Sequence, residues 1–170
     1  EKMDAAVLLT SSSLSHTPAR RAACKKGVRI ASLPNIIDQS FIRLADTDFN
    51  KIARLSQKLR DILTIAKEAK ITAPNGSNLV LSLAGNQGYA DTGLIHSPGE
   101  FSNLPSGEAC ISPQKNKVSG VLIVDSGMEY LAEEKEKLTL SIKDGRVARI
   151  SGGPAAQRLR RQLAPFGTKS

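Results

Sequence analysis

The chain has 170 residues, a hydrophobic content of 40% and a formal net charge of +8 at pH 7. This length suits one ordinary domain or two small ones, and no apolar run approaches the roughly 18 residues that a membrane span needs. Residues 1–75 carry most of the positive charge, which favours anionic partners, but aromatic side chains that could stack on bases are few. We therefore expect neither a membrane protein nor a nucleic-acid-binding protein.

The first 70 residues predict an α/β lobe. Residues 4–10 and 28–32 are apolar runs of strand length. Between them Thr17 and Pro18 predict a helix start, as a hydroxyl N-cap followed by proline at the first helical position, and Gly27 predicts the helix end. A strand, a short helix and a second strand imply parallel pairing through a right-handed crossover.

Residues 46–70 predict the longest helix, which Asp46, Thr47 or Asp48 can cap. Apolar side chains recur at helical spacing along one face, at Ile52, Leu55, Leu59, Ile62, Leu63 and Ala66. We interpret this stripe as the face that packs against the sheet, and not as a surface for a partner.

Residues 71–153 predict a β-rich module. The sequence PNGS at 74–77 is a strong turn signal between strands at 70–73 and 78–84, and Asp144-Gly145 predicts a tight hairpin between strands at 138–143 and 146–151. A further strand is predicted at 118–125 and a solvated turn at 132–137. Residues 154–170 predict a helix with proline at its first position. The fold class expected is therefore α+β or α/β, with a partial open parallel lobe followed by the β-rich module.

Residues that could carry chemistry are sparse. His16 and His96 lie far apart in loops and match no catalytic or metal-binding motif. Cys24 and Cys110 have no disulfide or metal spacing, so we expect two reduced, partly buried thiols in a cytoplasmic protein.

The loop SNLPSGE at 102–108 is the one stretch that presents an acid on a stiff backbone. Pro105 fixes one backbone angle and Gly107 can supply a positive one, so together they could hold Glu108 in a single orientation. A metal ligand or a general base needs such rigid presentation. An ordinary structural turn explains the same residues, and one acid cannot hold a catalytic divalent ion alone.

Residues 70–153 resemble the middle of the aminopeptidase T family of metallopeptidases. The resemblance rests on ITAPNGSNLVLSLAG, on DTG at 91–93, on PGEFSNLPSGEACISP, on VSGVLIVDSG and on LSIKDGRVARISGG. LSHTPARRAACKKGVRIASLP is similar to the α/β portion that precedes this region in the family. One departure is Gln114, because many of these aminopeptidases carry His or Asp soon after the matching Pro113.

The resemblance implies a cytoplasmic exopeptidase with two divalent ions (zinc, cobalt or manganese), a peptide substrate and possible homodimers. It implies that Glu108 is the first metal ligand, and that the others lie in a C-terminal metal domain beyond Ser170. The expected organisation is an α/β lobe at 1–70, the β-rich module at 71–153, and a helix at 154–170 that leads to that domain. The chain would then be a fragment that is inactive alone.

Two alternatives stay open. A sister group with the same architecture, similar to 2,5-dihydroxypyridine dioxygenases, binds one iron(II) ion, and its loop need not contact the metal. The chain could also be a non-catalytic module whose basic front lobe binds an anionic partner.

Overall fold

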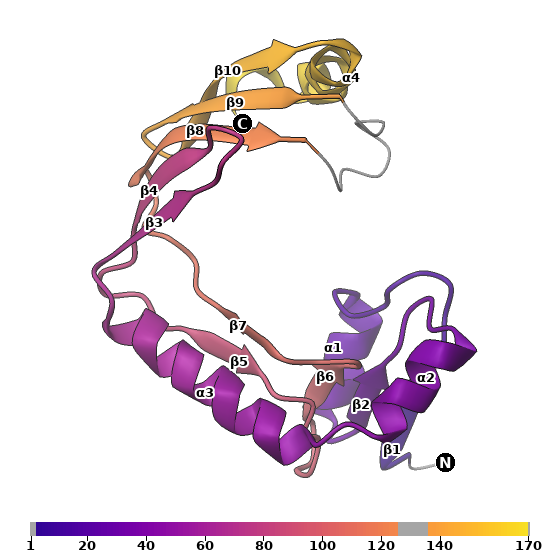
Figure 1. Ribbon diagram of the computed structural model, residues 1–170. Helices are drawn as coiled ribbons and strands as arrows, with labels where there is room; N and C mark the ends of the chain where they lie inside the picture. Colours follow the sequence, from indigo (N-terminus) through magenta and orange to yellow (C-terminus); the bar gives the residue numbers. More distant parts are fainter. Residues whose placement is uncertain (1–2, 126–135, 170) are drawn as a thin grey trace. The chain divides into compact units, whose positions relative to one another are not determined.

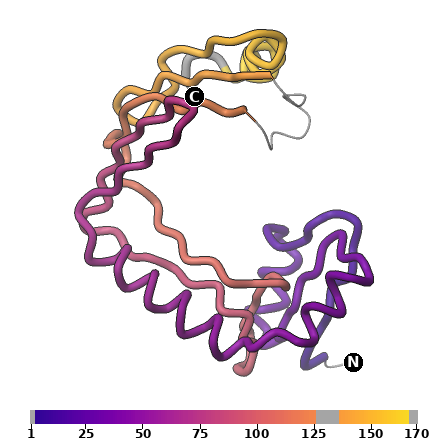
Figure 2. The backbone as a smooth tube through the Cα atoms, viewed as in Figure 1, coloured from indigo at the N-terminus to yellow at the C-terminus, as the bar shows by residue number. Residues whose placement is uncertain are grey.

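The computed structural model describes residues 3–125 and 136–169, and it confirms a fold of mixed helices and strands (Figure 1). The chain divides into two compact units, Glu1–Leu63 with Gly88–Ile111, and Thr64–Gln87 with Ser112–Ser170. The backbone enters the second unit at the end of the longest helix, returns to the first for residues 88–111, and then leaves again (Figure 2). The turn predicted at 132–137 lies largely outside the described residues.

The first unit contains a parallel sheet of three strands in the order β1-β2-β6. The strands are β1 (Ala5–Leu8), β2 (Arg29–Ser32) and β6 (Phe101–Asn103), and helix α1 (Pro18–Lys25) connects the first two. The predicted strand, helix and strand are confirmed. The third strand was not predicted, because three residues are too few to show an alternating pattern.

The ends of α1 follow from local chemistry. The Thr17 hydroxyl accepts a hydrogen bond from the Arg20 N–H at 3.2 Å, as a side-chain N-cap does. Gly27 follows the helix with φ of 91°, in the left-handed region where glycine avoids the clash of a Cβ atom.

Two helices follow β2, namely α2 (Asp38–Ala45) and α3 (Phe49–Ile65). The sequence predicted one helix at 46–70. The structure shortens it at both ends, since residues 68–70 belong to a strand. Asp48 caps α3 by accepting from the Lys51 N–H at 3.0 Å.

The face of α3 that packs inward differs from the prediction. Leu55, Leu59 and Ile62 are 59%, 44% and 50% exposed, whereas Ala53 and Ser56 are buried. The glycines that approach this helix do so at larger residues: a Cβ atom at Gly107 would lie 3.3 Å from the Ile52 side chain, and one at Gly93 would collide with the Phe49 ring.

Two short antiparallel strands, β5 (Tyr89–Asp91) and β7 (Glu108–Cys110), complete the first unit. Segment 88–111 therefore groups with the front of the chain, through the hydrogen-bonded pairing of β6 with β2. The contiguous domains predicted at 1–70, 71–153 and 154–170 differ from the two units for this reason.

The second unit is an antiparallel sheet in the order β10-β9-β8-β4-β3. Its strands are β3 (Glu68–Thr72), β4 (Asn78–Ser82), β8 (Val118–Val124), β9 (Leu138–Lys143) and β10 (Arg146–Gly152). The predicted turn at 74–77 and the Asp144-Gly145 hairpin are confirmed, with Asp144 at φ of 50° and Gly145 at 73°.

Helix α4 (Pro154–Leu163) lies against β9 and β10 (Figure 1) and continues as a short 3₁₀ helix, η1 (Ala164–Lys169). Leu138, Ala155 and Ala156 form the core of this unit and are fully buried. Half-buried Leu140, Ile150 and other aliphatic side chains surround them. Among the described helices, none is long and apolar enough to cross a lipid bilayer.

Candidate functional site

The loop that presents Glu108 joins β6 to β7 in the first unit. It leaves the parallel sheet at the carboxyl end of β6, which is the edge where ligands bind in open α/β folds. The Leu104–Pro105 peptide is cis. Gly107 has φ of 125°, a backbone angle that residues other than glycine rarely adopt. Proline and glycine therefore shape this loop as predicted.

Glu108 is exposed and is the first residue of β7, so it lies at a strand start rather than inside the loop. No hydrogen bond or ion pair reaches its carboxylate from the part of the chain that the structure describes. Its exposure agrees with a group that serves a ligand, and the role of metal ligand stays a prediction. Leu104 and Ile111 beside it are half-buried.

Asp91 lies opposite Glu108 in the β5–β7 pairing, and it is only 8% exposed. Its carboxylate accepts hydrogen bonds from the Ser102 hydroxyl and, at 3.3 Å, from the Asn103 N–H. Its backbone carbonyl accepts from the Gly107 N–H at 3.2 Å. Reasoning from the sequence gave this residue no role, although the DTG sequence at 91–93 was a signal that could have drawn attention to it.

A second buried polar group ties the loop before α1 to the same edge of the sheet. The Ser15 hydroxyl donates to Asn103 Oδ1 at 2.6 Å and lies 3.1 Å from the Ser32 hydroxyl. Arg20 donates to the Ser15 carbonyl at 2.7 Å and stacks over the Phe101 ring, 4.2 Å from its centroid. These groups satisfy one another, so they form a rigid edge and not an open ligand site.

Tyr89 responds to the charges of this region. Partial burial of its side chain, followed by the negative charges of Asp91 and Cys110, raises the pKa of the phenol. Arg20 opposes this shift and Glu108 adds to it. The phenol is thus kept in its neutral form, which can donate a hydrogen bond.

The histidines and cysteines do not gather into a centre. His16 and His96 are both exposed, and the two cysteines are free, with Cys24 half-buried and Cys110 exposed. Across residues 3–125 and 136–169, no group of three or more His, Cys, Asp or Glu side chains could hold a metal ion.

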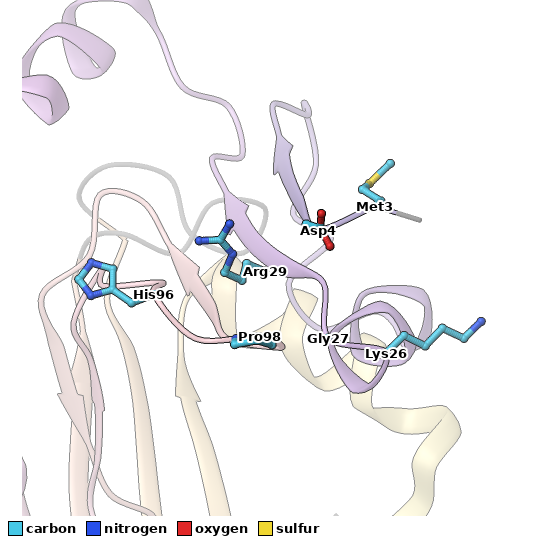
Figure 3. Close-up of a pocket in the computed structure, with 7 residues that line it drawn as sticks. All are labelled: Met3, Asp4, Lys26, Gly27, Arg29, His96 and Pro98. Atoms are coloured by element: carbon cyan, nitrogen blue, oxygen red, sulfur yellow. The ribbon is translucent and has the colours of Figure 1, made fainter. Parts of the chain in front are cut away.

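An open pocket of about 450 Å³ lies at the amino ends of β1 and β2 (Figure 3). Arg29, His96 and Asp4 are among the residues that line it, while the Lys26 side chain points away from Arg29 and His96 (Figure 3). Glu100 holds the nearby backbone by accepting from the N–H groups of His96 and Ser97 at 2.6 and 2.7 Å. These hydrogen bonds, with that from Ser97 the larger influence, lower the pKa of the Glu100 carboxyl.

Comparison with known proteins identifies related chains. A family model described as 2,5-dihydroxypyridine 5,6-dioxygenase matches residues 1–170. A curated protein of that name from Pseudomonas putida strain KT2440 is 26% identical over 159 residues, which cover 90% of this chain and 44% of that protein.

Two solved structures are similar in fold. The structure of the 2,5-dihydroxypyridine dioxygenase from Pseudomonas putida KT2440 matches with a TM-score of 0.76 and 24% identity, over 94% of this chain and 46% of that chain. AmpT from Thermus thermophilus matches with a TM-score of 0.61 and 16% identity, over 88% of this chain and 44% of that chain. The chain therefore spans about half the length of these relatives.

These matches overturn the predicted assignment to the aminopeptidase T family. The family model and the curated relative are dioxygenases, so the predicted aminopeptidase, hydrolase and metallopeptidase functions are wrong. The likeness to AmpT at 16% identity shows a shared fold alone. The turn residues and strand patterns that carried the resemblance belong to that fold, and for this reason they could not separate the two families.

Gln114 was the departure from the aminopeptidase pattern. In the structure its side chain accepts from the Ser82 hydroxyl at 2.9 Å and donates to the Ala84 carbonyl at 2.6 Å. It thus fastens the segment before β8 to the end of β4. The Gln114 side chain therefore has a structural role in this chain.

Proposed function

Because this chain belongs to the family of 2,5-dihydroxypyridine 5,6-dioxygenases, we propose that it is part of an enzyme that opens a dihydroxylated pyridine ring with dioxygen. The observation that carries the proposal is the family match over residues 1–170. The curated relative from Pseudomonas putida supports the same reaction class. Since the chain spans about half the length of that relative, the proposal concerns the whole enzyme and not this segment alone.

The family assignment favours a metal-dependent enzyme, and we propose iron(II) as the metal. Non-haem oxygenases commonly hold iron(II) with two histidines and one carboxylate. Within the described residues no group of three suitable side chains is found, so these residues do not by themselves fit a ferrous centre. The zinc, cobalt and manganese predicted for a peptidase gain no support from the family.

The contribution of this chain is the rigid loop that carries Glu108. Its exposed carboxylate is available to accept a hydrogen bond, and a hydroxylated pyridine offers O–H donors. The amides of Leu104 and Gly107 in this loop are hydrogen-bonded, and its turn contains a proline and a glycine, so the carboxylate is presented without a large loss of conformational freedom on binding. The predicted cytoplasmic location and homodimer stay predictions.

The test is a turnover assay on the longest natural protein that contains this chain, purified without oxygen and loaded with iron(II). We expect it to consume 2,5-dihydroxypyridine and dioxygen in equal amounts, followed by ultraviolet absorbance and an oxygen electrode. Loading with zinc provides the control, because zinc has no redox chemistry. An iron-loaded protein that leaves 2,5-dihydroxypyridine and its monohydroxylated analogues unchanged would overturn the proposal.

A further inference from the structure

The loop at 104–107 is held at both ends by one residue. The Asn103 N–H, just before the loop, donates to the Asp91 carboxylate at 3.3 Å, and the Gly107 N–H, at its other end, donates to the Asp91 carbonyl at 3.2 Å. The Leu104 N–H donates to the Ser32 carbonyl at 2.8 Å, which continues the β2–β6 pairing. Asp91 is thus the common partner of both ends.

The groups that face the Asp91 side chain act as hydrogen-bond donors, which suits a carboxylate. One oxygen accepts from the Ser102 hydroxyl and the other from the Asn103 N–H. The Ser102 hydroxyl itself accepts from the Gly93 N–H at 3.2 Å and shares its proton between Asp91 and the Asn103 carbonyl. An asparagine at position 91 would have no charge and one acceptor oxygen, so it could accept from only one of the two donors, and the Ser102 hydroxyl would have to reverse to accept from the new NH₂ group.

Asp91 pays for its burial with hydrogen bonds alone. It is 8% exposed, and none of the described basic side chains forms an ion pair with it. A buried carboxylate is costly unless its oxygens are satisfied. The backbone and hydroxyl donors around it must therefore keep their positions, and this fixes the loop to which they belong.

Gly93 supports the middle of the loop from the same segment. A Cβ atom at this position would collide with the Ser106 hydroxyl and lie 2.6 Å from a carbon of the Phe49 ring. With φ of 77°, Gly93 also has a conformation that other residues rarely adopt. Residues 91–93 thus contact the loop at its start, middle and end.

We infer that Asp91 is a positioning residue, which fixes loop 104–107 and thereby the direction in which Glu108 leaves the sheet. Glu108 follows Gly107 directly and pairs with Asp91 across β5 and β7, so any shift of the loop moves its carboxylate. The use of a fixed Glu108 in ring cleavage rests on the proposed function. The seating of the loop does not, because it follows from the contacts of Asp91.

Amide hydrogen exchange tests the seating in the full chain. We expect Asp91→Asn to speed exchange at Asn103 about tenfold or more, the effect of losing a hydrogen bond to a buried charged group. Exchange at Gly107 should also rise, because the loop loosens although the Asp91 carbonyl that accepts from this amide remains. Ser102→Ala removes one donor and should give a smaller increase at the same amides. Asp61→Asn, the same chemical change at an exposed acid of α3, is the matched control and should change neither amide.

The mobility of a nitroxide label at position 108 reports how firmly the loop holds this residue. With Cys24 and Cys110 replaced by serine, we expect Asp91→Asn to sharpen the spectrum of a Glu108→Cys label and to leave a Lys143→Cys label unchanged. A role in general stability would loosen both labels or neither. If the Asp91→Asn variant does not fold, the same two labels are measured in the Ser102→Ala variant, and we expect the same difference between them.

The inference is overturned if exchange at Asn103 and Gly107 and the label at 108 are unchanged in folded variants. It is equally overturned if exchange rises throughout the first unit. Turnover of 2,5-dihydroxypyridine is measured separately on the wild type. A wild-type protein that is inactive but whose loop is held as described would contradict the proposed function and not this inference.

Discussion

Asp91 and Glu108 face each other across two short strands, yet one carboxylate is buried and the other is exposed. Like charges directly opposite in a sheet repel each other. Here the buried carboxylate is compensated by hydroxyl and amide donors, and the exposed one by water. Because their surroundings differ, Asp91 has a structural role and the Glu108 carboxylate is free to bind a ligand.

Glu108→Gln tests that availability. We expect the free energy of unfolding to change by no more than about 0.5 kcal/mol, as for surface substitutions without partners. Removing the repulsion with Asp91 could even stabilise the fold slightly. Urea unfolding measures the change, with Lys143→Gln as a surface control. A loss above about 1.5 kcal/mol would mean that Glu108 is a tied structural group.

Tyr89 should titrate above its ordinary pKa of 10.0. Burial and neighbouring negative charge favour the neutral phenol in the folded state. The folded pKa is therefore higher than the unfolded one, so this contribution to stability is complete below the unfolded pKa and is lost as pH rises through the folded pKa.

Phenolate absorbance in a Tyr130→Phe background isolates Tyr89, because the chain has two tyrosines. Cys110→Ser removes one of the charges that raise the pKa and should lower the midpoint. The chain unfolded in urea supplies the reference. A folded midpoint at or below that reference contradicts the expected direction.

At the scale of elements, α3 shows that helical periodicity alone does not tell which apolar arc packs inward. Its wide apolar arc contains the exposed Leu55, Leu59 and Ile62 as well as half-buried Ile52 and Leu63. Burial instead centres on Ala53 and Ser56, while the neighbouring Gly93 and Gly107 approach the helix at Phe49 and Ile52. The choice between the arcs depends on those neighbours.

Two leucine truncations should separate the exposed stripe from a real core. We expect Leu59→Ala to change the free energy of unfolding by about 0.5 kcal/mol or less. Leu138→Ala should cost about 2–5 kcal/mol, because Leu138 is fully buried against α4 and leaves a cavity. Thermal unfolding followed by circular dichroism measures both. Equal losses would show that the stripe is covered in solution.

At the scale of the whole molecule, the chain forms two units and spans about half the length of its relatives. Its described residues offer one exposed acid on a fixed loop and no cluster of metal ligands. The proposed ring cleavage therefore needs metal ligands that these described residues do not supply.

Residues 1–170 expressed alone should show no turnover of 2,5-dihydroxypyridine with iron(II), because the described residues lack a ligand set. The longer protein under the same conditions is the positive control. Iron-dependent activity of the short chain, abolished by Glu108→Ala, would mean that the centre lies within these residues after all.

The basic front of the chain gives a separate prediction. Residues 1–75 carry thirteen basic and seven acidic side chains, so we expect weak binding to DNA or RNA that falls steeply with salt. Fluorescence anisotropy at several salt concentrations measures this. A tight complex that survives high salt and distinguishes sequences would favour the alternative of a module that binds an anionic partner.

Features that depend on a few adjacent residues could be predicted from the sequence. Thr17 and Gly27 mark the start and the end of α1, the PNGS turn joins β3 to β4, and Asp144-Gly145 forms the turn between β9 and β10. In each case one hydroxyl, or one residue tolerant of positive φ, is sufficient. The rigid shape of the loop before Glu108 was predictable for the same reason.

Features that depend on residues far apart in the chain could not be predicted and are seen in the folded structure. The pairing of β6 with β2, the inward face of α3 and the burial of Asp91 beneath the loop each join distant segments. Burial and hydrogen bonding are properties of the assembled surroundings, and no short sequence pattern encodes them. The family was misassigned from sequence for a related reason, since two chemistries share one architecture and hence its turns.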